Sequence, residues 1–131
     1  MVINPIYKLL VVSTSTVHGS GFLDYIKEDF VKFIASDELL FIPFARPSGI
    51  SFDAYTAKVQ EALDDKNIKV TGLHEFQNKK KAIQEAKAIF VGGGNTFLLL
   101  KTLYDLDLVH QLRVQVSKGT PYVGTSAGSN L

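Results

Sequence analysis

The sequence predicts a single three-layer α/β domain, in which a mainly parallel sheet is covered by helices on both faces. Apolar runs of strand length recur along the chain, and amphipathic helical patterns fill the intervals between them. A chain of 131 residues with 46% hydrophobic residues is long enough to bury one core. We therefore expect one domain over residues 1–131, with right-handed crossovers between its parallel strands.

The expected strands are rich in β-branched or aromatic residues, and turn residues bound each of them. They cover Lys8–Ser13, Leu39–Phe44, Ile68–Leu73, Ala88–Gly92 and Tyr122–Thr125. The intervening segments place apolar residues at helical spacing. These faces are Leu23, Ile26, Phe30, Phe33 and Ile34; Tyr55, Val59, Ala62 and Leu63; Leu98, Leu99, Thr102 and Leu103; and Leu108, Leu112 and Val116. A further helix is expected to start at Lys79, and we interpret Lys79–Lys81 as a solvated face.

Composition excludes several classes of function. A formal charge of +1 and a pI near 7.9 give no electrostatic reason to expect nucleic acid or an anionic membrane as a partner. The absence of cysteine excludes disulfides, thiolate metal sites and a cysteine nucleophile, and it fits a reducing compartment. The apolar stretch Leu9–Val12 is too short for a signal peptide or a membrane span. We expect a soluble cytoplasmic protein.

A candidate nucleophile follows the last expected strand, in the motif Gly124-Thr125-Ser126-Ala127-Gly128. A serine in a sharp turn from strand to helix has a strained backbone, and the flanking glycines keep side chains out of the crowded crossing. The Ser126 hydroxyl would then stand at the carboxyl edge of the sheet. The Ala127 amide, at a helix N-terminus, would face a developing oxyanion. This pattern is typical of acyl transfer.

Three consecutive glycines, Gly92–Gly94, follow a second expected strand. Glycines allow the main chain to approach a ligand closely and to present its amides. A dinucleotide site fails on spacing because Phe97 stands where a small residue is needed, and no lysine motif of a P-loop follows. A serine turn needs a second oxyanion donor from a neighbouring loop, so Gly94 is the candidate. A tight turn without a catalytic role is the alternative, and Asn95 or Thr96 can cap the next helix.

These segments resemble peptidase E, the α-aspartyl dipeptidase family of serine peptidases. Its glycine loop resembles Ile89–Phe97, and its nucleophile turn resembles Gly124–Asn130. Weaker similarity runs through Val12–Thr16, Ile42–Ala45, Tyr55–Lys58 and Val70–His74, so the likeness spans the chain.

The resemblance implies a fold like that of class I glutamine amidotransferases, related to flavodoxin-like folds, with Ser126 as the nucleophile. It implies that the amides of Gly94 and Ala127 form the oxyanion hole, and that Gly93 and Asn95 lie beside the substrate. The implied reaction is cleavage of dipeptides with an N-terminal aspartate, without a metal or another cofactor.

In that family the catalytic histidine, its acidic partner and a substrate-binding arginine follow the nucleophile. We therefore expect this chain to be the N-terminal part of such a peptidase, inactive by itself, with base and acid supplied by sequence beyond residue 131. Within the chain, His18 is the candidate base because it lies in a loop at a carboxyl end. His74 and His110 are interpreted as surface or packing residues. Arg46 is a candidate contact for an anionic substrate, with a solvent-facing role as the alternative.

Two alternatives to a dipeptidase stay open. One is a hydrolase of β-aspartyl compounds, as in the cyanophycinase-like relatives that share the serine turn. The other is a protein that binds a ligand or a partner without catalysis. Because a short helix after Ser126 would leave apolar surface exposed, we also expect the isolated 131 residues to self-associate, so a homo-oligomer is a further expectation.

Overall fold

The computed structural model describes residues 9–12 and 20–125. Its strands and helices alternate along the chain, as the sequence predicts. The strands are β1 (Leu9–Val12), β2 (Glu38–Ile42), β3 (Lys69–Gly72), β4 (Ile89–Val91) and β5 (Tyr122–Thr125). The α-helices are α1 (Ser20–Ile34), α2 (Phe52–Leu63), α3 (Lys79–Gln84), α4 (Thr96–Asp105) and α5 (Val109–Ser117). Short 3-10 turns follow β2, α2 and β3, at η1 (Pro47–Gly49), η2 (Asp64–Lys66) and η3 (Leu73–Glu75).

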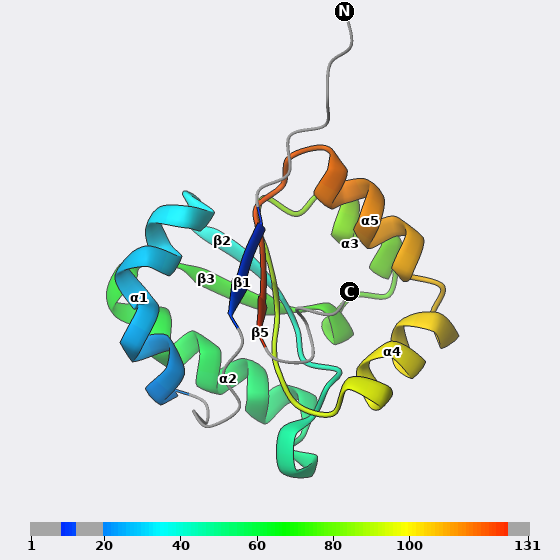
Figure 1. The fold of residues 1–131 in the computed structure, drawn as a ribbon, viewed down its shortest axis with the longest axis horizontal. Helices are drawn as coiled ribbons and strands as arrows, with labels where there is room; N and C mark the ends of the chain where they lie inside the picture. Colours follow the sequence, from blue (N-terminus) through cyan, green and yellow to red (C-terminus); the bar gives the residue numbers. More distant parts are fainter. Residues whose placement is uncertain (1–8, 13–19, 126–131) are drawn as a thin grey trace, which may run out of the picture.

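All strand pairs within these residues are parallel, and the strand order is β1-β5-β4-β2-β3. Helices cover both faces of the sheet, with α1 and α2 on one face and α3, α4 and α5 on the other (Figure 1). The predicted three-layer fold is confirmed. The bounds of the three predicted strands between residues 39 and 92 differ from the observed ones by one or two residues at each end. The second strand stops at Ile42 because Pro43 has no N–H for the ladder, and Leu73 belongs to η3.

Alternate residues of the central strands enter opposite layers of the core. Leu39 and Phe41 pack with α1 and α2, whereas Leu40 and Ile42 pack with the helices of the other face. On the predicted helical faces, Phe30, Val59, Leu103 and other apolar residues are buried. Continuous burial on both faces explains why the central strands are apolar without alternation.

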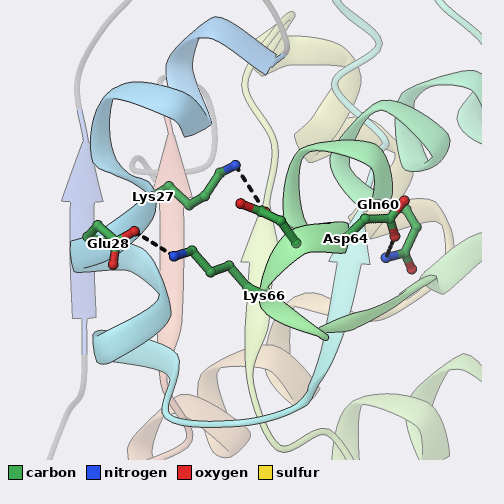
Figure 2. Close-up of polar contacts among 6 residues, drawn as sticks. Lys27, Glu28, Gln60, Asp64 and Lys66 are labelled. Atoms are coloured by element: carbon green, nitrogen blue, oxygen red, sulfur yellow. Dashed lines mark hydrogen bonds and ion pairs between the residues drawn. The ribbon is translucent and has the colours of Figure 1, made fainter.

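Polar contacts fix α1 against the end of α2 (Figure 2). The Lys27 ammonium lies 3.2 Å from the Asp65 carboxylate, and the Lys66 ammonium lies 2.6 Å from that of Glu28. The hydrogen bond from Lys66 lowers the pKa of Glu28 below its ordinary value. These pairs are exposed, so they orient the two elements more than they stabilise them.

The outer edge of β3 is occupied by one side chain of α2. The Gln60 amide nitrogen donates to the Ile68 carbonyl at 2.9 Å, and the Val70 amide donates to the Gln60 amide oxygen at 2.8 Å. Since β3 is the last strand on that side of the sheet, these two main-chain groups face away from β2. Gln60 therefore satisfies main-chain groups that another strand would otherwise bind.

From β2 the chain continues to β3 on one side in the sheet, whereas from β4 it continues to β5 on the other side, so β2 and β4 form a topological switch point. The chain leaves β2 toward α2 on one face, whereas it leaves β4 toward α4 on the opposite face (Figure 1). In parallel α/β sheets, ligands bind outside the carboxyl ends of the strands at such a switch point. This rule points to the two loops that follow β2 and β4.

Candidate active site

The loops that follow β2 and β4 are hydrogen-bonded to each other. The Gly92 amide donates to the Ile42 carbonyl at 3.2 Å, and the Asn95 amide donates to the Ala45 carbonyl at 2.8 Å. The glycine loop is thus held at both of its ends on the neighbouring loop. Between these two points lie Gly93 and Gly94.

Gly94 is required by its surroundings. Its φ is +144°, and a Cβ there would lie 2.7 Å from the Ala45 carbonyl oxygen and 2.9 Å from the Pro47 nitrogen. Gly94 is exposed, and its amide donates no hydrogen bond to any residue within the described ranges. An exposed amide at a switch point can bind a developing oxyanion.

The Tyr55 side chain extends from α2 to the same glycine loop. Its hydroxyl donates a hydrogen bond to the Gly93 carbonyl at 3.0 Å. The ring passes so close to Gly92 that a Cβ there would collide with the Tyr55 hydroxyl and with Phe41. Burial raises the pKa of Tyr55 to about 12. The missing side chain of Gly92 therefore makes room for the tyrosine.

Of the two predicted caps, Asn95 and Thr96, it is Asn95 that caps α4. Its side-chain oxygen accepts a hydrogen bond from the Leu98 amide at 3.0 Å, which satisfies one free N–H of the first turn. The side-chain amide nitrogen makes no hydrogen bond to the described residues. Those two N–H donors are available for a substrate group, while the oxygen is already occupied.

Strand β5 brings Gly124, the first residue of the serine motif, beside the last residue of β4. Gly124 pairs with Val91, so β5 and β4 end at the same edge, and Ser126 is the next residue after β5. Ser126 and Ala127 lie outside the described residues, as does His18. Their assigned roles stay predictions.

Two further histidines lie within the described ranges. The His74 side chain is 15% exposed, and its Nε2 atom lies 2.7 Å from the Asp53 carboxylate, while its ring packs against Phe52. This is the packing role predicted from the sequence. His110 is exposed on α5.

Arg46 has partners within its own loop. Its Nε atom donates to the Ile50 carbonyl at 3.0 Å and its Nη2 atom donates to the Gly49 carbonyl at 3.1 Å. The guanidinium also lies over the Phe52 ring, 5.4 Å from its centre. Arg46 adopts a left-handed φ of 42°. Its observed contacts shape the loop after β2.

The helical periodicity places Tyr55 on an apolar face but does not predict the hydrogen bond of its hydroxyl. The signal was a hydroxyl on an otherwise aliphatic face, since a buried tyrosine needs a hydrogen-bond partner. Among the described residues, no cluster of three His, Asp or Glu side chains could hold a metal ion. No helix in these ranges has both the length and the apolar character needed to span a bilayer.

Known proteins are similar to this chain in sequence and in fold. The chain is 43% identical over 127 residues to a Drosophila melanogaster protein described as "Probable alpha-aspartyl dipeptidase", covering 94% of this chain and 52% of that protein. It is 44% identical over 124 residues to a "Peptidase E" of Shewanella denitrificans, covering 93% of this chain and 52% of that protein. The chain thus spans about half the length of the curated relatives it matches.

A candidate peptidase E protein from Listeria monocytogenes has a similar solved fold, with a TM-score of 0.69 at 22% identity, covering 92% of this chain and 58% of that chain. The model of peptidase family S51 matches residues 9–131, which include both the glycine loop and the serine turn. The chain therefore belongs to peptidase family S51.

Proposed function

We propose that this chain supplies the nucleophile and the oxyanion donors of a serine dipeptidase that acts on dipeptides with an N-terminal aspartate. The observation that carries the proposal is the pairing of Val91 with Gly124, because it aligns the glycine loop with the strand that leads to Ser126. Family membership and the names of two similar proteins support the reaction class and the substrate.

In the proposed reaction, the Ser126 hydroxyl oxygen attacks the peptide carbonyl carbon, and a base accepts the hydroxyl proton. The carbonyl oxygen becomes an oxyanion that accepts hydrogen bonds from the amides of Gly94 and Ala127. The carbon–nitrogen bond then breaks, and the base returns the proton to the leaving amine. Water hydrolyses the resulting ester and regenerates the serine. This acyl transfer uses no cofactor.

The base is proposed to be a histidine in sequence beyond residue 131. The relatives are about twice as long as this chain, which leaves room for such a residue. His74 is already paired with Asp53, and His110 is exposed on α5. The free amide group of Asn95 and the main chain at Gly93 are proposed substrate contacts. We further propose that the enzyme works in the cytoplasm, as its lack of cysteine suggests.

The test compares full-length protein with its Ser126→Ala variant on Asp-Leu, Ala-Leu and β-aspartyl-arginine. We expect rapid cleavage of Asp-Leu alone, and a loss of at least about a thousandfold in the variant, because removal of a nucleophile leaves only weak residual catalysis. Ser117→Ala, on α5, is the matched serine control and should keep full activity. Equal activity of wild type and Ser126→Ala would refute the proposal. Preference for β-aspartyl-arginine would favour the cyanophycinase-like alternative.

A further inference from the structure

The peptide group between Gly93 and Gly94 carries both the atom that Tyr55 binds and the proposed oxyanion donor. The Gly93 carbonyl accepts the Tyr55 hydrogen bond, and the N–H of the same peptide group belongs to Gly94. The described part of the chain contains no cis peptide bond. In a planar trans peptide, the C=O and N–H bonds point in opposite directions. A carbonyl directed toward buried Tyr55 therefore directs the Gly94 amide away from the core.

This peptide group needs a restraint. Glycine on both sides removes the steric barriers that hold most peptide planes in one orientation. The flanking hydrogen bonds, from the amides of Gly92 and Asn95, fix the ends of the loop but do not involve the middle peptide group. Rotation by half a turn would aim a carbonyl oxygen at the developing negative charge and would abolish its stabilisation.

We propose that Tyr55 is a positioning residue for the oxyanion hole, whose hydroxyl holds the Gly93–Gly94 peptide group with the Gly94 amide directed at the reacting carbonyl. The inference rests on the proposed function and adds a residue to it. Tyr55 touches neither substrate nor nucleophile in this scheme, and it acts only through the loop.

The tyrosine is itself well fixed. Its ring makes an edge-to-face contact with Phe41, with the ring centres 4.8 Å apart, and only 9% of the residue is exposed. At the start of its helix, the Ser51 side chain accepts a hydrogen bond from the Ala54 amide at 3.1 Å. Burial raises the pKa of the hydroxyl to about 12, so it stays protonated near neutral pH. Tyr55 is thus a rigid and permanent donor.

The test is Tyr55→Phe in the full-length enzyme, because phenylalanine keeps the ring packing and removes only the hydroxyl. We expect kcat for Asp-Leu to fall at least about tenfold while KM stays within about twofold, since the amide acts on the transition state and not on bound substrate. An aspartyl aldehyde, whose adduct with serine carries an oxyanion, should bind about tenfold more weakly, and free aspartate should bind equally well. Tyr104→Phe, on the exposed face of α4, is the control with unchanged kinetics.

A second substitution guards against a purely structural effect. Incorporation of 3-fluorotyrosine at position 55 restores the hydroxyl and should return kcat to within about twofold of wild type. Unchanged kcat in Tyr55→Phe would overturn the inference, as would a loss that appears only in KM or a failure of the fluorinated side chain to restore kcat. If Ser126→Ala is inactive while Tyr55→Phe is fully active, the proposed function stands and this inference fails. Wild-type activity in Ser126→Ala would refute the proposed function itself.

Discussion

At the scale of single residues, the glycines after β4 differ in what they do. Gly92 leaves space for a ring from α2, whereas Gly94 adopts a φ that other residues rarely reach and packs on the main chain of the loop after β2. Neither requirement can be read from three consecutive glycine letters, which are equally compatible with a simple turn. Their close packing makes the loop a rigid element of the site.

We predict that Gly94→Ala is more harmful than Gly49→Ala. Both positions have positive φ, but a Cβ at Gly49 would have no atom within 4 Å, whereas one at Gly94 would meet the Ala45 carbonyl. Gly49→Ala should cost about 1 kcal/mol of unfolding free energy, and Gly94→Ala about 3 kcal/mol. Urea unfolding of the two variants checks the difference, and Gly94→Ala should also lose dipeptidase activity. Equal stability losses would contradict the packing described here.

At the scale of elements, the start of α4 combines a structural and a proposed functional role in one side chain. The Asn95 oxygen caps the helix, and its amide nitrogen is the group that remains for a substrate. Aspartate keeps the capping oxygen but replaces those N–H donors with negative charge. The two roles can therefore be separated by substitution.

Asn95→Ala should cost about 1 kcal/mol of stability through loss of the cap, whereas Asn95→Asp should stay within about 0.5 kcal/mol of wild type. Asn95→Asp should nevertheless raise KM for Asp-Leu at least about fivefold, because a carboxylate repels an acidic substrate. Thermal unfolding and steady-state kinetics measure the two effects. An unchanged KM in Asn95→Asp would contradict the proposed contact between Asn95 and the substrate.

Sequence patterns predict these elements well where apolar periodicity is strong. They predict less well where a strand end or a contact depends on a single atom. The parallel strands follow from apolar runs, and a cap at Asn95 or Thr96 follows from residue type; the structure confirms the strands and selects Asn95 as the cap. The end of β2 depends on the missing N–H of Pro43. The hydrogen bond of Tyr55 depends on the distance between two segments 38 residues apart, which no local pattern contains. The prediction for Ser126 is still untested.

At the scale of the whole molecule, aromatic rings connect α1 to the candidate site through the sheet. Phe30 contacts Phe90 and Phe90 contacts Phe41, each with ring centres 5.2 Å apart, and Phe41 contacts Tyr55. All four belong to one buried cluster. Packing in the core thus sets the position of the ring that reaches the glycine loop.

Two core substitutions of the same kind should separate stability from function. Phe30→Leu and Phe41→Leu both replace a fully buried ring with a smaller side chain. Each should cost about 1–2 kcal/mol of unfolding free energy. Only Phe41→Leu removes the ring that supports Tyr55, so it should lower kcat at least about fivefold, while Phe30→Leu should leave kcat within about twofold. Assays at a temperature where both variants are fully folded give the comparison. A larger kcat loss in Phe30→Leu would contradict it.

The Gln60 side chain has a consequence for how copies of the protein can meet. By occupying the outward main-chain groups of Ile68 and Val70, it blocks the simplest route by which a sheet recruits a strand from another molecule. Joining two sheets along β3 would first require breaking both of these hydrogen bonds. If copies do assemble, they should not pair along this edge, and removing the Gln60 amide would leave both main-chain groups open to pairing with another strand.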